Sequence, residues 1–496
     1  MNKKYIIAFD QGTTSTRTII FDSQGHIISI SQKELTQHYP NSGWVEHDPI
    51  EIYNAQKDTF ASVLKDTGID AKAIAAIGIT NQRETTVVWD KETGEPIYNA
   101  IVWLDNRTKD ICEHLKNEGL ESYIHKNTGL VIDAYFSGTK LKWILDNVKG
   151  ARQKAEAGKL LFGTIDSWLI YKFTNGKQHC TDHTNASRTM LYNIKDLKWD
   201  ETLLNALEIP KSMLPDVKTS SSYFGSVEHN GTAIPICGVA GDQQAALFGQ
   251  GGSVEGIAKN TYGTGCFLLL NNGKDYVASE NGLLTTLACS LPNKHIDYAL
   301  EGSIFIGGAS IQWLRDKMQI IDSAKDTEHI CNSTPALKDL YVVPAFAGLG
   351  APYWDSNAKG AIYGITLDIG KNEIIKATVE ALAYQTKDVL TAMEEDTGKP
   401  INTLKVDGGA SSNNYLMQFQ SDLLNIPVDR PKMIEITALG AAMLAGLHAE
   451  FWTNNDINTI REVDQIFTPK IDSETRRKKY KGWLNAIKRT QTTNES

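Results

Sequence analysis

Two strand–turn–strand segments constrain the fold of this chain more than any other feature of its sequence. One has its turn at Asp10–Ser15 and the other at Thr261–Gly265, and each turn has an apolar, β-rich run of residues on both sides. Such runs around a Gly-containing turn are typical of hairpins. One hairpin in each half of the chain indicates two related lobes, which we place at residues 1–250 and 251–496.

Helical and strand-like segments alternate along the rest of the chain. Apolar residues at 3.6-residue spacing predict helices, and short apolar runs between turns predict buried strands. The longest predicted helix follows Asn372, which suits an N-cap, and stops at Gly398. Other helices are predicted over 50–65, 243–248, 414–424 and 438–448, and strands over 73–80, 87–89, 101–103, 234–240 and 404–407. This order predicts an α/β fold in which each lobe is a mixed β-sheet flanked by helices.

Composition and charge exclude several classes of protein. Hydrophobic residues make up 41% of the 496 and charged residues 22%, ordinary values that exclude a disordered or fibrous chain. The net charge of −9 argues against binding to nucleic acid. The six cysteines form no CxxC pair, so no zinc ribbon is expected. The first apolar run ends at Asp10, too soon for a signal peptide, and no stretch reaches the ~20 apolar residues of a membrane span. We therefore expect a cytoplasmic protein.

Three turns rich in Gly, Thr, Ser and Asn follow predicted strands, at Asp10–Ser15, Thr261–Gly265 and Asp407–Asn413. Such turns direct backbone N–H groups and hydroxyls into one concavity, which suits phosphate oxygens. Each turn alone is more often a plain hairpin, but three in one chain favour a nucleotide site. The sequence has no G-x-x-x-x-G-K-[ST] loop, so the site is not of the P-loop kind. Asp10 offers the carboxylate oxygen that Mg²⁺ prefers.

Charged residues also follow two of the predicted strands. Arg83 and Glu84 come after strand 73–80, where their donors and acceptors suit the neighbouring hydroxyls of a polyol. A surface ion pair is the simpler alternative. Asp242 follows strand 234–240 and precedes a helix, which is where open α/β sheets place ligands. It is a candidate general base toward a hydroxyl group, and the alternative is a helix N-cap.

Several segments together resemble the FGGY carbohydrate kinases. Both stretches that characterise this family are matched, from Tyr135 to Asn147 and from Gly360 to Glu380. The resemblance covers residues 5–490. The other matching segments are 9–15 (Phe-Asp-Gln-Gly-Thr-Thr-Ser), 81–85 (Asn-Gln-Arg-Glu-Thr), 241–246 (Gly-Asp-Gln-Gln-Ala-Ala), 260–267 (Asn-Thr-Tyr-Gly-Thr-Gly-Cys-Phe), 309–315 and 406–409.

The resemblance implies two lobes of the ribonuclease H-like type found in actin, hexokinase and the heat-shock ATPases. For this chain it implies ATP-dependent phosphorylation of glycerol to sn-glycerol 3-phosphate, the first step of glycerol catabolism, with Mg²⁺ as cofactor. The first lobe would hold glycerol and the transferred phosphate, and the second would hold the nucleotide. The family also suggests a homodimer or homotetramer.

The resemblance assigns roles to individual positions. Asp242 is the expected catalytic base, and Asp10 is expected to help hold Mg²⁺. The residues expected to bind glycerol are Arg83, Glu84, Trp103, Tyr135, Asp242, Gln243 and Phe267, with Trp103 and Phe267 packed on its carbon chain. Those expected to contact ATP or ADP are Thr13, Thr14, Ser15, Arg17, Thr264, Gly308, Gln312, Gly409 and Asn413.

One segment departs from the family pattern, and two other functions stay open. In relatives, the region of Ser222–Thr232 carries a Gly/Arg loop for fructose 1,6-bisphosphate or a histidine phosphorylated by the sugar-phosphotransferase system. Here it is short and has no Arg, and His229 matches neither mode of regulation, so we expect neither. One alternative function is a kinase for a pentulose or another sugar, although Arg83-Glu84 and Phe267 favour a small triol. The other is a nucleotide-switched binding protein like actin or the heat-shock ATPases, although no separate peptide-binding region follows the second lobe.

Overall fold

The structure is a computed structural model that describes residues 3–492. The chain divides into two compact units. Unit 1 comprises Met1–Ser253, Thr285–Tyr298 and Ile436–Ile460, and unit 2 comprises Val254–Leu284, Ala299–Glu435 and Arg461–Ser496. The lobes 1–250 and 251–496 stay a prediction, and their outer ends, residues 1–2 and 493–496, lie outside the described residues.

Unit 1 is built on a six-stranded mixed sheet with the order β13-β14-β5-β1-β2-β3. The first two strands form the predicted antiparallel hairpin, although Asp10 and Gln11 belong to the first strand rather than to the turn. The neighbouring strands β1, β5 and β14 are parallel. The strands are β1 (Tyr5–Gln11), β2 (Ser15–Phe21), β3 (Ile27–Glu34), β5 (Ile74–Asn81), β13 (Ser221–His229) and β14 (Thr232–Gly241).

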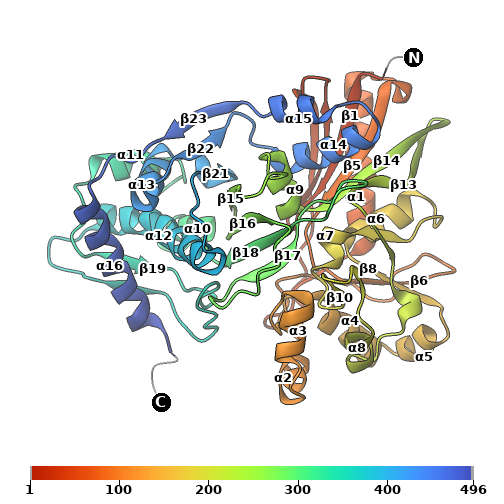
Figure 1. Cartoon of the computed structure of the whole chain (residues 1–496), viewed down its shortest axis with the longest axis horizontal. Helices are drawn as coiled ribbons and strands as arrows, with labels where there is room; N and C mark the ends of the chain where they lie inside the picture. Colours follow the sequence, from red (N-terminus) through yellow and green to blue (C-terminus); the bar gives the residue numbers. More distant parts are fainter. Residues whose placement is uncertain (1–2, 493–496) are drawn as a thin grey trace. The chain divides into compact units, whose positions relative to one another are not determined.

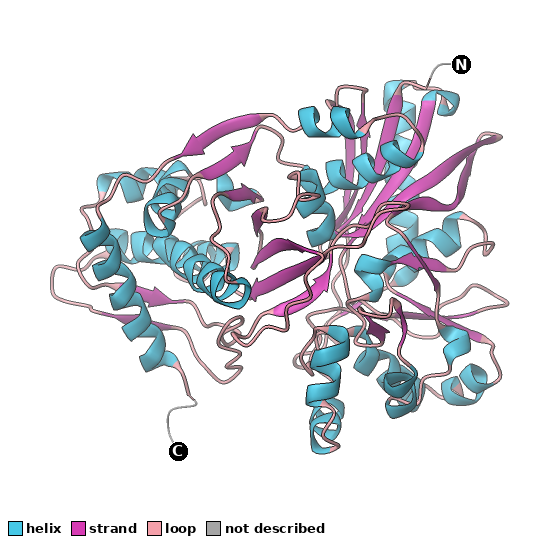
Figure 2. Cartoon of the chain, in the orientation of Figure 1, coloured by secondary structure: helices cyan, strands magenta, loops and turns pink. Residues whose placement is uncertain are grey.

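Helices cover this sheet on both faces, as Figures 1 and 2 show. On one face, α1 (Pro49–Thr67) and α6 (Ile165–Phe173) enclose an apolar core that includes Phe9, Phe60 and Trp168. On the other face, α14 (Ile436–His448) packs on β1, β5 and β14, with α9 (Asp242–Gly249) against it. Strand β5 is therefore buried along its whole length, as expected for a parallel strand between two helical layers.

Two glycines of the sheet let α14 approach closely. A Cβ atom at Gly78 would lie 2.1 Å from the carbonyl oxygen of Ala441, and one at Gly238 would lie 2.6 Å from the backbone nitrogen of Ala445. No other residue fits at these distances, because only glycine lacks a Cβ. The two positions thus fix how α14 lies on the sheet.

The remaining elements of unit 1 surround this core. The predicted strand 101–103 is shorter than expected, because Val102 and Trp103 follow β7 rather than belonging to it. The other helices are α2 (Lys109–Asn117), α3 (Glu121–Thr128), α4 (Ser137–Asn147), α5 (Ala151–Glu156), α7 (His183–Ala186), α8 (Glu201–Ala206), α15 (Asn454–Ile460) and the short 3-10 turns Ala71–Ala73 and Lys211–Met213. The strand pairs are β4 (Glu46–His47) with β7 (Ala100–Ile101), β6 (Val87–Asp90) with β8 (Leu160–Gly163), β9 (Cys180–Asp182) with β12 (Asp216–Lys218), and β10 (Tyr192–Asn193) with β11 (Lys198–Trp199).

Unit 2 repeats the hairpin arrangement of unit 1. Its seven-stranded sheet has the order β17-β18-β16-β15-β21-β22-β23, in which the hairpin strand β15 is antiparallel to β16 and parallel to β21. The strands of this sheet are β15 (Ala258–Tyr262), β16 (Cys266–Gly273), β17 (Leu284–Leu287), β18 (Tyr298–Ile304), β21 (Leu404–Asp407), β22 (Val428–Pro431) and β23 (Val463–Phe467), and β19 (Tyr341–Val343) and β20 (Ala361–Tyr363) form a separate pair. By the bounds of the units, Thr285–Leu287 of β17 and Tyr298 of β18 are counted with unit 1. Its helices are α10 (Gly308–Asp316), α11 (Asp326–Ser333), α12 (Lys371–Thr397), α13 (Asn414–Leu424), α16 (Ser473–Thr490) and the 3-10 turn Gly409–Ser412. The predicted fold class, mixed sheets flanked by helices, is confirmed.

The start of α12 corrects one prediction. The helix begins at Lys371, so Asn372 lies inside it and is not the N-cap. Gly370 holds that position, and its backbone N–H donates to the Glu373 carboxylate at 2.9 Å. Glu373, the third residue of the helix, therefore caps the N-terminus of α12. The predicted stop at Gly398 is confirmed, with a φ of 63°.

Two further sequence expectations concern thiols and membranes. All six cysteines are free, and all but Cys289 are buried. Within residues 3–492 no helix combines the length and apolar character that crossing a bilayer requires.

Candidate active site

The carboxyl ends of three parallel strands of unit 1 lie at one level. In β1 and β5, Gln11 is opposite Asn81, and in β14 and β5, Gly241 is opposite the same Asn81. The segments that follow these strands therefore start side by side at one edge of the sheet. This edge is where open α/β sheets bind ligands, and it brings together the first Gly/Thr turn, Arg83-Glu84 and Asp242.

Arg83 and Asp242 form an ion pair at this edge. The Nε atom of Arg83 lies 3.3 Å from Oδ1 of Asp242, and that oxygen also accepts a hydrogen bond from the backbone N–H of Gln243 at 2.7 Å. The Arg83 side chain is 2% exposed, whereas that of Asp242 is 30% exposed. Arg83 is held in turn by Gln244, whose Oε1 accepts from its guanidinium at 3.2 Å. A fixed, buried cation thus orients a carboxylate that solutes can reach.

Glu84 forms an ion pair with Arg188, not with its sequence neighbour Arg83. Arg83 and Glu84 are adjacent in sequence, but the Glu84 carboxylate accepts a hydrogen bond from Nε of Arg188 at 2.6 Å, with both side chains buried. Glu84 has a φ of 60°, which is uncommon for any residue except glycine. Non-glycine residues held in this region cluster at functional sites. Because the side chains of Arg83 and Glu84 are both buried, the alternative that the two form an ion pair at the surface is wrong.

Two aromatic rings stand beside these pairs. Trp103 and Tyr135 meet edge to face, with ring centroids 5.6 Å apart. The guanidinium of Arg188 lies 5.5 Å from the centre of the Tyr135 ring. The indole N–H of Trp103 donates to Oγ1 of Thr13 at 2.9 Å, so this ring is tied to the first Gly/Thr turn. Apolar faces beside fixed charges suit a small ligand that has both carbon atoms and hydroxyls.

The first Gly/Thr turn closes through a hydrogen bond from the Gly12 N–H to the Ser15 carbonyl at 2.9 Å. The carbonyls of Thr13 and Thr14 accept from Gln37 Nε2 and the Leu35 N–H, both at 2.9 Å. These two carbonyl groups are thus directed to protein donors, and Thr14 is an exposed residue. Arg17 adds a positive charge, with its Nε 3.5 Å from Oδ2 of Asp10. The turn has the donors that a phosphate group needs.

Unit 2 contains a pocket of about 620 Å³ at the ends of β15 and β21. Its lining includes five of the residues predicted to contact the nucleotide: Thr264, Gly308, Gln312, Gly409 and Asn413. Its apolar lining consists chiefly of Tyr262, Ile311, Val379, Leu382, Ala410 and Leu416. A pocket of this size, apolar with a few polar groups, suits the base and ribose of a nucleotide. We call it the nucleotide-side pocket.

Close backbone packing shapes this pocket. The Gly308 N–H donates to the Gly263 carbonyl at 2.9 Å, and a Cβ at Gly308 would lie 2.7 Å from that oxygen. Asn413 caps α13, because its Oδ1 accepts from the Leu416 N–H at 3.0 Å, and its Nδ2 donates to Thr327 at 3.1 Å. The remaining predicted residue, Phe267, lies on β16 in the same unit.

Sequence reasoning missed several residues of these sites. Arg188 and Gln244 hold Glu84 and Arg83. Gln244 stands two residues after Asp242 in a motif already singled out, so its position was a usable signal, whereas no local pattern points to Arg188. In the nucleotide-side pocket, the missed residues include Arg315, Lys325, Thr327 and Glu328, which come from α10, α11 and the segment before α11.

Asp10 is the predicted metal ligand. Its side chain is 9% exposed, and the residue lies at the end of β1, beside the first turn. Across residues 3–492 no group of three or more His, Cys, Asp or Glu side chains could hold a metal ion. Mg²⁺ often binds through one or two carboxylates, with phosphate oxygens and water completing its shell. A single hard oxygen at Asp10 fits that pattern.

Two models of one protein family match the chain. The N-terminal domain of the FGGY family of carbohydrate kinases matches residues 5–249, and its C-terminal domain matches residues 258–449. The two matches together cover most of the chain.

Full-length relatives are similar throughout. The chain is 60% identical to the glycerol kinase of Alkaliphilus oremlandii over 491 residues, covering 98% of this chain and 97% of that protein. It is 60% identical to the glycerol kinase of Fusobacterium nucleatum over 493 residues, covering 98% and 99% of the two chains.

Solved structures share the fold. Plasmodium falciparum glycerol kinase with ADP superposes with a TM-score of 0.91 at 38% identity, covering 99% of both chains. A gluconate kinase from Lactobacillus acidophilus has a TM-score of 0.86 at 23% identity, covering 98% of this chain and 97% of that one. The second likeness concerns the fold alone.

Proposed function

The chain belongs to the FGGY family of carbohydrate kinases, and on that premise we propose that it phosphorylates glycerol with ATP. The products are sn-glycerol 3-phosphate and ADP, and the reaction is the first step of glycerol catabolism. The fold is that of the actin- and hexokinase-like ATPases. The observation that carries the proposal is the Arg83–Asp242 pair, which holds a carboxylate at the ligand-binding edge of the sheet.

Glycerol has three hydroxyls, each a donor and an acceptor of hydrogen bonds. The carboxylates of Glu84 and Asp242 offer acceptors, Arg83 offers donors, and the Tyr135 hydroxyl offers both. Gln243 stands next to Asp242 in α9. We assign Trp103, and Phe267 of unit 2, to packing on the carbon chain.

Asp242 is the proposed general base. It accepts the proton of the attacking hydroxyl while that oxygen forms a bond to the γ-phosphorus and the bond to the ADP oxygen breaks. The Arg83 guanidinium and the Gln243 N–H hold Oδ1, so the carboxylate is oriented before glycerol binds. A positioned general base contributes about 10²–10⁴-fold to a rate.

The phosphates of ATP are assigned to the first turn, where Thr13, Thr14 and Ser15 supply N–H and hydroxyl groups and Arg17 supplies charge. The rest of the nucleotide is assigned to the nucleotide-side pocket, with polar contacts from Thr264, Gly308, Gln312, Gly409 and Asn413. Mg²⁺, held through Asp10, supplies positive charge to the phosphate oxygens when bound. Positioning and electrostatic stabilisation are the main sources of catalysis in phosphoryl transfer.

The test is release of ADP as a function of the acceptor. The full chain is mixed with ATP and Mg²⁺, and ADP is measured with glycerol, D-xylulose, gluconate or no acceptor. We expect rapid release with glycerol alone. Faster release with D-xylulose or gluconate would support a sugar kinase of the same family, and equal release without any acceptor would support a nucleotide-switched binding protein.

Assembly, location and regulation are proposed from the sequence. We propose a cytoplasmic homodimer or homotetramer that does not bind nucleic acid. The segment Ser222–Thr232 forms the β13–β14 hairpin, where the ring of His229 packs edge to face on Phe60 with centroids 5.3 Å apart. This packing supports our expectation that neither fructose 1,6-bisphosphate nor phosphorylation of His229 controls the enzyme.

A further inference from the structure

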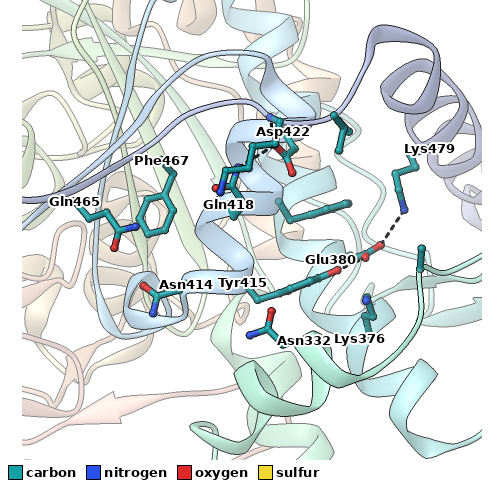
Figure 3. Close-up of a pocket in the computed structure, with 14 residues that line it drawn as sticks. Asn332, Lys376, Glu380, Asn414, Tyr415, Gln418, Asp422, Gln465, Phe467 and Lys479 are labelled. Carbon is teal, nitrogen blue, oxygen red and sulfur yellow. Dashed lines mark hydrogen bonds and ion pairs between the residues drawn. The ribbon is translucent and has the colours of Figure 1, made fainter.

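Unit 2 has a second pocket, of about 480 Å³, that the proposed reaction does not use (Figure 3). Its lining comes from α11, α12, α13, β23, the segment after β23 and α16. Its deepest charged group is Glu380, where the second family stretch of the sequence ends. Glu380 does not line the nucleotide-side pocket, so its presence in that stretch calls for another role.

Glu380 is buried beneath this second pocket and is already hydrogen-bonded. The hydroxyl of Tyr415 donates to its Oε1 at 2.6 Å, and the ammonium of Lys479 lies 3.9 Å from its Oε2 (Figure 3). Burial raises the pKa of Glu380, which makes its negative charge easier to lose.

The pocket has an excess of positive charge. Three lysines line it, Lys376, Lys470 and Lys479, against two acidic residues. The second acid, Asp422, accepts from the Gln418 side chain at 2.9 Å and from the Lys470 backbone N–H at 2.6 Å. With three lysines against two carboxylates, the lining of the pocket carries a net positive charge, which attracts an anion.

Aromatic rings form the rest of the wall. Tyr415 and Phe419 stand one turn apart on α13 with parallel rings, whose centroids are 6.2 Å apart. Phe467 adds a third ring from β23. Rings beside lysines bind molecules that carry a charged group on a flat or apolar body.

The same three helices line both pockets of unit 2. From α12, Val379 and Leu382 line the nucleotide-side pocket, whereas Lys376 and Glu380 line the second one. At 100° per residue, these pairs lie on different faces of the helix. From α11 and α13, Glu328 of the nucleotide-side pocket accepts two hydrogen bonds from Asn414 of the second pocket, at 3.0 and 2.9 Å. A shift of these helices that changes the lining of one pocket therefore also changes the lining of the other.

Lys376 strengthens this connection. Its ammonium donates to the carbonyls of Cys331 and Thr334, at 2.9 and 2.7 Å, at the end of α11. An anion that pairs with the Lys376 ammonium competes with these hydrogen bonds. It would thereby loosen the end of α11, the helix that carries Thr327 and Glu328.

We propose that this second pocket binds a small organic anion, a phosphate or carboxylate group on a flat or apolar body, and that its occupancy changes the affinity for nucleotide. The coupling rests on the proposed nucleotide site, but the binding of the anion does not. By linkage, the anion and the nucleotide change each other's affinity by the same factor.

Phenyl phosphate is the probe. It is titrated calorimetrically into the full chain saturated with ADP and sn-glycerol 3-phosphate, so that the active site is occupied. We expect one further site, with affinity lowered at least about tenfold in the double variant Lys470→Gln, Lys479→Gln, because two charge-assisted contacts are lost. Lys478→Gln, an exposed neighbour on α16 that does not line the pocket, is the matched control and should bind as the unaltered chain does.

The coupling is then measured as the affinity for ADP with and without phenyl phosphate, which should differ in the unaltered chain and agree in the double variant. Absence of a further site, or equal binding by the double variant, overturns the proposal. Equal affinity for inorganic phosphate overturns the role of the aromatic rings. If phenyl phosphate binds as expected but ADP release does not depend on glycerol, the proposed function fails and the anion site stands.

Discussion

The Glu84 carboxylate and the Arg188 guanidinium form a buried pair, with Oε1 and Nε 2.6 Å apart, although the two residues are 104 positions apart in the sequence. A buried pair is held by mutual attraction, and removal of one partner leaves the other charge buried and uncompensated. The pair therefore fixes the backbone at Glu84, whose φ of 60° needs support from its surroundings.

Arg188→Met should lower the free energy of unfolding by about 3–5 kcal/mol, the usual loss when one partner of a buried pair is removed. Denaturation in urea measures the change. Combining it with Glu84→Gln should cost less than the sum of the two single changes, because no charge is then left unpaired. Additive losses in this cycle would show that the pair does not act as a unit.

Asp242→Asn should lower the rate of glycerol phosphorylation by about 10²–10⁴-fold, because an amide cannot accept the proton of the attacking hydroxyl. The affinity for glycerol, measured by calorimetry without ATP, should fall much less. Asp66→Asn, an exposed position on α1, is the matched control and should keep its rate. Near-normal turnover of Asp242→Asn would exclude it as the base.

Trp103→Phe keeps an aromatic ring but removes the N–H that donates to Thr13 at 2.9 Å. One hydrogen bond is worth about 1 kcal/mol, so kcat should fall about fivefold while KM for glycerol changes little. Trp103→Ala, which also removes the ring, should raise KM for glycerol. If Trp103→Phe still lowers kcat in a Thr13→Val background, the link between the ring and the turn is not the cause.

Gly308→Ala and Gly409→Ala test the nucleotide-side pocket as a pair. A methyl at Gly308 meets the Gly263 carbonyl at 2.7 Å, so both the melting temperature and the affinity for ATP should fall. Nothing lies within 4 Å of a Cβ at Gly409, so its melting temperature should stay unchanged. A several-fold rise in KM for ATP in Gly409→Ala then reports direct contact with the nucleotide, and an unchanged KM argues against that contact.

Asp388 predicts a pH dependence of stability. Burial raises its pKa from 3.8 to about 7, and its oxygens accept from the Tyr480 hydroxyl and the Trp483 indole, both at 2.7 Å. The folded chain thus keeps a proton that the unfolded chain loses, and stability from this group falls as pH rises from about 4 to about 7. Asp388→Asn should flatten that decline in a series of thermal melts. The pKa of Asp166 is also raised to about 7, so Asp166 still titrates in the Asp388→Asn variant. Part of the decline in stability with pH should therefore remain in that variant.

The sequence predicted those parts of the molecule whose signals are local. Helix α13 has the predicted bounds, 414–424, because an Asn N-cap and a short apolar period define it. The two hairpins were predicted from their turns for the same reason. The start of α12 was wrong by two residues, since the contact from Glu373 back to Gly370 outweighs the capping preference of Asn372.

Long-range pairing could not be predicted in this way. Adjacent Arg83 and Glu84 suggested one ion pair, yet each side chain pairs with a residue more than 100 positions away, Asp242 and Arg188. No spacing along the chain records such a contact, because the sheet edge that creates it comes from three strands far apart in sequence.

The position of α14 has a consequence for synthesis of the chain. This helix covers the sheet of unit 1 at Gly78 and Gly238, but it follows most of unit 2 in the sequence. A ribosome must therefore translate residues 254–435 before the groove left by these glycines can be filled. Unit 1 therefore completes its folding late in synthesis. A gene fragment that stops at residue 253 encodes unit 1 without α14, the helix that covers this face of its sheet.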